Sequence, residues 1–178
     1  MCDLVLTKHY NYQVNMCDLR SRRIGRANPS QKTIVKGILL GFVLVAVCAL
    51  MHAISMVFIG EWLINRGQKT GEPPSLRVSS ILLSSVFAII ILLHLAEAAI
   101  WAITYDSLGL LNDFRTSLEF SLGRYTTSGA SGIRLPIEWR LLGQVESIAG
   151  LLLVGLSTAF LFLVIHRMFD IRRIAHGK

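Results

Sequence analysis

The sequence predicts an all-α membrane protein with three transmembrane helices and, between the second and the third, a shorter re-entrant helix and loop. Of the 178 residues, 53% are hydrophobic and only 16% are charged, which excludes an ordinary soluble domain. Three long apolar runs alternate with polar segments. Between the last two runs lies a turn rich in Thr, Ser and Gly, whose backbone groups can lie at membrane depth only if protein or water surrounds them.

The first predicted transmembrane helix covers residues 34–64. Residues 37–60 carry no formal charge, and at about 1.5 Å per residue a run of this length crosses about 30 Å of hydrocarbon. The preceding residues 1–33 are polar and basic and hold no apolar core for a signal peptide, so we expect no cleavage. Residues 65–77 are expected to form a short connecting loop, because their glycines and the pair Pro73–Pro74 break helices.

The second predicted transmembrane helix runs from Val78 to Tyr105 and is uncharged except for Glu97. His94 lies one turn before Glu97 on the same face, a spacing at which two side chains can supply metal ligands, although two ligands do not make a site. The alternative is that Glu97 is protonated or hydrogen-bonded within the helical bundle. Because a charge inside a membrane is costly, either arrangement indicates a partner or a function.

The segment between the second and third helices, residues 106–136, is too short and too polar in its middle to form two full spans. Asn112 or Asp113 can cap a short helix that begins near Phe114. We expect four residues of this helix to pack against the bundle: Leu118, Phe120, Leu122 and Tyr125. Its last carbonyls and the negative end of its dipole then point at the Thr126–Thr127 turn and favour a cation there.

The third predicted transmembrane helix runs from Ile137 to Ile165 and precedes a basic tail, residues 167–178. Small residues recur along it at helical spacing: Gly143, Ser147, Gly150, Gly155, Ser157, Thr158 and Ala159. Small faces let helices approach closely in lipid, so we expect this helix to pack tightly against its neighbours. Gly37 and Gly41 form a GxxxG spacing in the first helix, which is a weaker signal of the same kind.

Charge and cysteine usage restrict the partners. The formal net charge is +7, but the Lys and Arg residues flank the apolar runs, which favours a lipid bilayer with anionic headgroups over nucleic acid. The chain has three cysteines: Cys2, Cys17 and Cys48. Their number is odd and Cys48 lies in an apolar run, which excludes a disulfide framework. The sequence has no HExxH, no GxSxG and no phosphate-binding loop, so we expect no enzymatic activity.

The sequence YTTSGASGI, followed by LP, EWR, LLG and GLSTAFLF, resembles the pore region of the potassium-channel family. It is most similar to short bacterial two-pore-domain-like ion channel proteins, which carry one pore loop per chain and assemble as tetramers. The segment LLHLAEAAIWA resembles the helix before the pore, so the likeness extends over residues 83–163. The resemblance implies an ion-channel pore module of helix, pore loop and helix at residues 78–166, a homotetramer, and a multi-pass location in the bacterial inner membrane.

The resemblance also implies a selectivity filter, in which backbone carbonyls replace the hydration shell of the ion. An ungapped alignment with the family pattern, T-x-G-Y-G followed by Asp, places Thr127 on the Thr and Gly129 on the first Gly. Tyr, the second Gly and Asp are replaced by Ala130, Ser131 and Gly132. We therefore expect weakened or altered selectivity for a monovalent cation such as potassium, with no bound metal or other cofactor. The expected filter residues are Thr126, Thr127, Ser128, Gly129, Ala130, Ser131 and Gly132.

Further roles follow from the same resemblance. Gly150 or Gly155 would lie where the inner helix bends to open, as a gating hinge. Glu146 would hydrogen-bond the pore loop from behind, and we expect Glu97 and His94 to support that loop as well. Ionisable side chains within membrane spans, such as Glu97 and Glu146, usually indicate a function.

Two functions of different classes remain open. The first is a homotetrameric ion channel that passes monovalent cations. The second is a non-conducting membrane scaffold or metal-linked accessory protein derived from a channel fold. In the second, four residues converge: His52, His94, Glu97 and Glu146. Arg124 and Arg134 lie near the expected ion path, and their charge opposes cation flux.

The orientation in the membrane is predicted differently by two signals. Three spans place the termini on opposite sides, yet both termini are basic. The excess of Lys and Arg before the first span favours a cytoplasmic N-terminus. The channel resemblance implies the opposite, with the C-terminal tail inside, and we prefer this orientation because the C-terminal basic cluster agrees with it.

Overall fold

The structure, a computed structural model, describes residues 31–70, 75–129 and 132–176, with the side chains of residues 67–70 and 171–176 excepted. These residues form helices and no strand: α2 (Gln31–Thr70), α3 (Leu76–Ser107), α4 (Phe114–Tyr125), a short 3-10 helix η1 (Ile137–Trp139) and α5 (Arg140–His176). The expected all-α class is confirmed. Pro73, Pro74 and most of the N-terminal segment, including Cys2 and Cys17, lie outside the described residues.

Within the described residues, three helices are long and apolar enough to cross a membrane: Gln31–Arg66, Leu76–Ser107 and Ile137–Asp170. The chain is therefore compatible with a multi-pass membrane protein, as the hydropathy pattern predicts. Each helix extends beyond the apolar run that predicts it. α2 continues to Thr70, past the expected end at residue 64, because helical hydrogen bonding continues into polar residues beyond the hydrocarbon.

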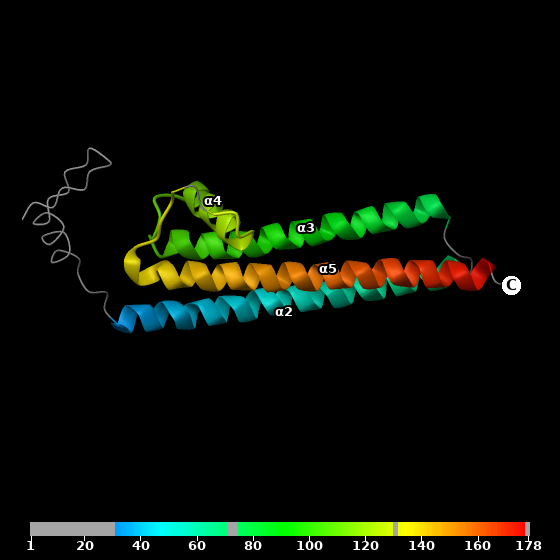
Figure 1. Cartoon of the computed structure of the whole chain (residues 1–178), viewed down its shortest axis with the longest axis horizontal. Coiled ribbons are helices and arrows are strands. Elements are labelled where there is room, and N and C mark those ends of the chain that lie inside the picture. Colours follow the sequence, from blue (N-terminus) through cyan, green and yellow to red (C-terminus); the bar gives the residue numbers. More distant parts are fainter. Residues whose placement is uncertain (1–30, 71–74, 130–131, 177–178) are drawn as a thin grey trace, which may run out of the picture.

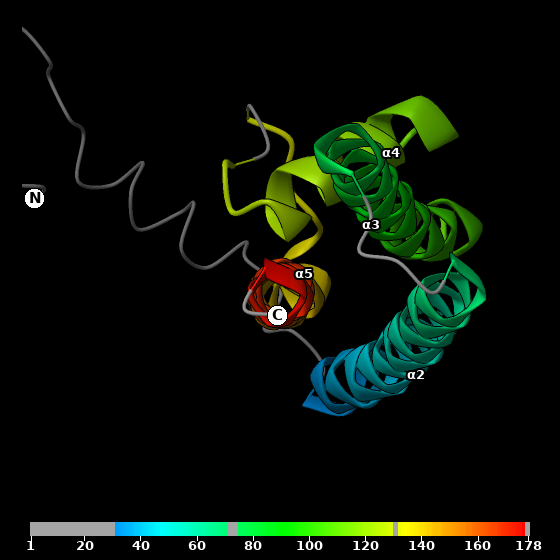
Figure 2. The same cartoon turned by 90° about the vertical axis from the view of Figure 1, so that its right-hand side faces the viewer.

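The three long helices run side by side, with α2 and α5 starting at the end of the molecule where α3 finishes (Figure 1). α4 lies at this same end and packs on both α3 and α5 (Figure 1). The view along the bundle shows α2 on the opposite side of α3 and α5 from α4 (Figure 2). The four helices thus enclose a common interior in the half of the bundle that contains α4.

Helix α4 begins where the sequence predicts. Asp113 is its N-cap, and its carboxylate accepts a 2.8 Å hydrogen bond from the backbone N–H of Thr116. The Thr116 N–H and hydroxyl both donate to Asp113, which holds the pKa of this carboxyl below its ordinary value. Phe120 and Tyr125 are buried, as expected, whereas Leu118 and Leu122 are only partly buried.

The main apolar core joins all four helices at the α4 end: Leu44, Cys48, Trp101, Tyr105, Phe120, Leu135, Leu142, Ala149 and Leu153. A smaller cluster of Met56, Ile59, Val86 and Ile90 joins α2 to α3 at the other end. Burial of the side chains in the main core holds α4 against α3 and α5. In lipid, this packing also supplies much of the attraction between helices.

Small residues lie at the closest helix contacts. A Cβ added to Gly41 on α2 would come within 3.2 Å of Leu142 on α5, and one added to Gly143 would come within 3.3 Å of the Phe120 ring on α4. At Gly150 a Cβ would lie 2.3 Å from the backbone carbonyl oxygen of Tyr125. Gly143 and Gly150 of α5 are therefore used for contact with α4, whereas the contact between α2 and α5 uses Gly41 of α2. Gly155 has nothing within 4 Å of an added Cβ among the described residues.

Candidate functional site

The end of α4 is closed by a tight turn. The carbonyls of Leu122, Gly123 and Arg124 accept backbone hydrogen bonds of 3.0–3.1 Å from Thr126, Gly129 and Thr127 respectively. Thr127 has a φ of 56° and Gly129 a φ of 92°, so the chain reverses instead of continuing extended. Three of the last α4 carbonyls are thus already hydrogen-bonded by the turn, which differs from the expectation that the last carbonyls of this helix favour a cation.

The expected filter residues that the structure describes lie on the surface of the single chain. Thr126, Thr127, Ser128 and Gly129 are exposed, and the hydroxyls of Thr126 and Ser128 are 2.8 Å apart. Gly132 is also exposed, with a φ of 87°. Ala130 and Ser131 lie outside the described residues.

The contact with Gly150 gives the depth of this turn along the bundle. Gly150 lies ten residues after Arg140, the first residue of α5. At about 1.5 Å of rise per residue, the C-terminal end of α4 therefore meets α5 about 15 Å from its start. The chain then returns through residues 132–136 to the beginning of α5, at the end of the molecule from which α4 entered (Figure 1).

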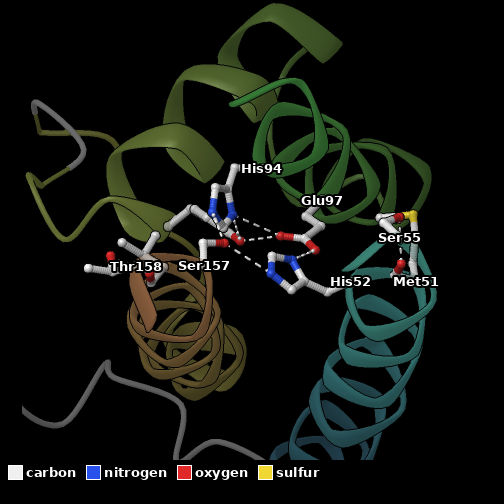
Figure 3. A network of polar contacts seen from close by, with 9 residues as sticks. Met51, His52, Ser55, His94, Glu97, Ser157 and Thr158 are labelled. Carbon is white, nitrogen blue, oxygen red and sulfur yellow. Dashed lines mark hydrogen bonds and ion pairs between the residues drawn. The ribbon is translucent and has the colours of Figure 1, made fainter. Parts of the chain in front are cut away.

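Next to the end of α4 lies a buried polar group that we call the histidine–glutamate cluster: His52, His94, Glu97, Tyr125 and Ser157. These side chains come from α2, α3, α4 and α5, and the labelled ones point toward one another in Figure 3. His52 and Glu97 are fully buried, and the His94 side chain is 16% exposed. One polar group thus joins every long helix to the end of α4.

Glu97 is the centre of the histidine–glutamate cluster. Its Oε1 lies 2.8 Å from Nδ1 of His52, and its Oε2 lies 3.2 Å from Nδ1 of His94 and accepts a hydrogen bond from the Tyr125 hydroxyl. The Tyr125 oxygen is in turn 2.8 Å from Nδ1 of His94. Ser157 Oγ lies 3.0 Å from Nε2 of both histidines. Both imidazole Nδ1 atoms therefore face Glu97, and both Nε2 atoms face Ser157.

Glu146 belongs to a second hydrogen-bond network. The Tyr105 hydroxyl donates a 2.6 Å hydrogen bond to Oε2 of Glu146, and Ser121 contacts Oε1. Ser121 Oγ also lies 2.7 Å from the backbone carbonyl oxygen of Ala98. Because one hydroxyl has one hydrogen, both Ser121 contacts are satisfied together when Glu146 is protonated and donates to Ser121, which then donates to Ala98.

The expected supporting residues thus separate into two groups. His94 and Glu97 contact Tyr125, the last residue of α4, whereas Glu146 contacts Ser121, one turn earlier on α4. The expected convergence of four residues holds for His52, His94 and Glu97, whose potential ligand atoms all lie within 4.8 Å of one another. Sequence reasoning missed Ser157 and treated Tyr125 only as a packing residue. For Ser157 the available signal was a hydroxyl within an apolar helix. For Tyr125 it was the phenol hydroxyl, which needs a partner when it is buried.

Arg124 and Arg134 line a cavity of about 310 Å³ between α4 and the start of α5, together with Phe120, Leu135, Arg140 and Gln144. The Arg124 guanidinium lies 5.2 Å from the centre of the Phe120 ring, a cation–π distance. Within the described side chains, none of the three arginines forms an ion pair. Positive charge therefore gathers beside α4, near the residues that the resemblance assigns to the pore.

Comparisons with protein-family models, with curated proteins and with solved structures found no match to this chain. Its function is therefore inferred from the geometry of α4, the turn that follows it and the two buried networks.

Proposed function

We propose that this chain is one subunit of a homotetrameric ion channel that passes monovalent cations along an axis lined by residues 126–132. One observation carries the proposal: the Thr126–Gly129 turn is exposed although the end of α4 meets α5 about 15 Å from its start. With the start of α5 placed at the edge of the hydrocarbon, that distance is about half of a 30 Å layer. A polar turn at that depth requires protein or water around it, and copies of the same turn around an axis supply both.

The chemistry of the turn favours a cation over an anion. The negative end of the α4 dipole points toward it, and the described residues 126–129 offer hydroxyl and carbonyl oxygens without a charged side chain. Since three α4 carbonyls already accept hydrogen bonds from the turn, the ion is coordinated by the oxygens of the turn itself. Ala130 and Ser131 stand where the potassium-channel pattern has Tyr and its second Gly. We expect this difference to make discrimination between potassium and sodium weak.

The two buried networks hold this pore helix in position. Tyr125 is tied to Glu97 and His94 on α3, and Ser121 is tied to Glu146 on α5. Both ends of the last turn of α4 are thereby fixed to spanning helices. A filter needs such support because its oxygen atoms must keep their spacing when an ion leaves.

The test is ion flux in liposomes that contain the purified full chain, with reversal potentials under asymmetric potassium and sodium. We expect cation flux from the wild type and increased potassium selectivity from the Ala130→Tyr, Ser131→Gly double variant. Leu152→Ala, at an exposed apolar position of α5, is the matched control and leaves selectivity unchanged. Native mass spectrometry is expected to give a tetramer. A monomer in lipid, or no flux of any small ion, contradicts the channel.

The second candidate is a non-conducting membrane scaffold or metal-linked accessory protein. The observation that favours it is the convergence of His52, His94 and Glu97 in one buried cluster. This candidate predicts the same fold and the same α4 contacts, but no flux. The flux measurement therefore separates it from the channel.

A further inference from the structure

We propose that the histidine–glutamate cluster is a binding site for a divalent transition metal of the zinc class. Its donors are Nδ1 of His52, Nδ1 of His94, a carboxylate oxygen of Glu97 and the phenol oxygen of Tyr125. Metal binding can be measured without measuring ion flux, so this proposal is tested separately from the proposed channel function. It joins α2, α3 and α4 through a single ion.

The donor set and its spacing suit such an ion. Two imidazoles and one carboxylate are a common zinc ligand set, and four-coordinate geometry is the usual one. Ligand atoms about 2.0–2.1 Å from a tetrahedral ion lie roughly 3.3 Å from one another. Here Nδ1 of His52 lies 2.8 Å from Oε1 of Glu97, and Nδ1 of His94 lies 3.2 Å from Oε2 of Glu97 and 2.8 Å from the Tyr125 oxygen. The potential ligand atoms of His52, His94 and Glu97 all lie within 4.8 Å of one another. Small side-chain movements therefore admit the ion.

The position of Ser157 is a second observation in favour of a metal ion, beside the spacing of the donor atoms. Metal-bound histidines usually donate their other ring N–H to a fixed acceptor, which sets the tautomer that ligates. Ser157 Oγ lies 3.0 Å from Nε2 of His52 and 3.0 Å from Nε2 of His94, so one oxygen with two lone pairs can accept both N–H groups. Both histidines then present an unprotonated Nδ1 to Glu97. A single serine on α5 thus prepares both rings for the same ion.

The number of hydrogens available for hydrogen bonds within the cluster is a third observation in favour of a metal ion. With Glu97 ionised and both histidines neutral, the five side chains supply four hydrogens, one each from His52, His94, Ser157 and Tyr125. They make six contacts with one another: His52 with Glu97, His94 with Glu97, His94 with Tyr125, Tyr125 with Glu97, and Ser157 with each histidine. In every assignment at least one contact joins two acceptors. A cation between the Nδ1 atoms and Glu97 removes that mismatch and offsets a carboxylate buried in a membrane span, as a proton on one histidine would; the Co²⁺ titration below distinguishes the two.

The position of the site explains what the ion would do. Tyr125 is the last residue of α4, directly before the Thr126–Gly129 turn. An ion bound to its phenol oxygen and to donors from α2 and α3 holds the end of α4 against both helices. The ion therefore acts as a structural centre for α4.

The experiment adds Co²⁺ alone, as a spectroscopic probe, to the untagged full chain in mild detergent, followed by Zn²⁺ competition. We expect one Co²⁺ per chain, with the visible absorption of a four-coordinate ion. His52→Ala and His94→Ala are expected to weaken binding at least 100-fold, and Ser157→Ala about 10-fold to 100-fold. His166→Ala is the matched control, because His166 forms a separate pair with Asp170 near the end of α5 and should leave binding unchanged.

X-ray absorption spectroscopy of the zinc-loaded wild type identifies the metal ligands directly, so it tests the site even if an alanine variant fails to fold. We expect two imidazole nitrogens, additional oxygen ligands and no sulfur. Absence of a bound ion, sulfur ligation by a cysteine, or loss of the ion in His166→Ala would overturn the site. Retention of Co²⁺ by a folded His94→Ala variant would overturn it as well.

Discussion

The backbone carbonyl of Tyr125, at the end of α4, lies so close to Gly150 on α5 that a Cβ at this position would come within 2.3 Å of its oxygen. No side chain fits there while the helices keep their present positions. The carbonyl is backbone and cannot turn aside as a flexible side chain would. Gly150 therefore determines how deeply α4 enters between α3 and α5, which is a reason for glycine separate from the expected gating hinge.

Gly150→Ala is expected to displace the end of α4 and destabilise the fold. Overpacking of this kind costs about 1–3 kcal/mol of unfolding free energy. Gly155→Ala, on the same helix with open space around it, is the control and should cost nothing measurable. Chemical unfolding in detergent measures both. Equal effects of the two variants would contradict the close contact, and a change of gating in Gly155→Ala alone would favour a hinge at that position.

The two buried glutamates are expected to respond differently to replacement by glutamine. Glu146 is satisfied as a protonated acid, so Glu146→Gln keeps an acceptor for Tyr105 and a donor for Ser121 and should cost less than about 1 kcal/mol. In the metal-free chain we expect Nδ1–H of His52 and the Tyr125 hydroxyl to donate to Glu97, a His52 tautomer that metal binding reverses, so Glu97→Gln turns an amide N–H₂ toward one of these donors and should cost about 1–3 kcal/mol. Thermal unfolding in detergent, without added metal, compares them. The reverse order would refute this assignment of protons.

Tyr125→Phe and Tyr105→Phe each remove one hydroxyl from a different network. Each change leaves a buried acceptor short of one hydrogen bond and should cost about 1–3 kcal/mol. Because the two hydroxyls bond different carboxylates, the costs should add within about 0.5 kcal/mol in the double variant. The measurement is a double-mutant cycle of unfolding free energies. A coupling energy well above that limit would show that the networks act as one.

Asp113 provides a pH dependence outside the membrane spans. Hydrogen bonds from Thr116 hold the pKa of its carboxyl below the ordinary value, so the ionised cap stabilises the folded state above the unfolded pKa, near 4. That contribution is lost as pH falls through the lower folded pKa. The stability difference between the wild type and Asp113→Asn should therefore be constant near pH 6 and shrink as the pH falls below about 4. A difference that grew on acidification would contradict the cap.

Local sequence features predicted the helices well. Three apolar runs indicated the three long helices, because burial in hydrocarbon depends on length and hydropathy alone. The start of α4 at Phe114 was predicted from the polar residues before it, since an N-cap acts within one turn. The extent of α2 was underestimated, because the polar residues up to Thr70 gave no apolar signal although they remain helical.

The arrangement of the buried polar groups was decided only by tertiary structure. Ser157 lies 105 residues from His52 in the sequence, and Tyr125 lies 28 residues from Glu97, so no spacing rule connects them. Nor could the sequence assign His52 to Glu97 and Ser121 to Glu146, since any of these groups could have satisfied the others. Sequence by itself thus determined which segments are helical and which residues are costly to bury. The packing of four helices determined which of those residues meet, because a buried polar group must find its partner wherever the helix contacts bring one within hydrogen-bonding distance.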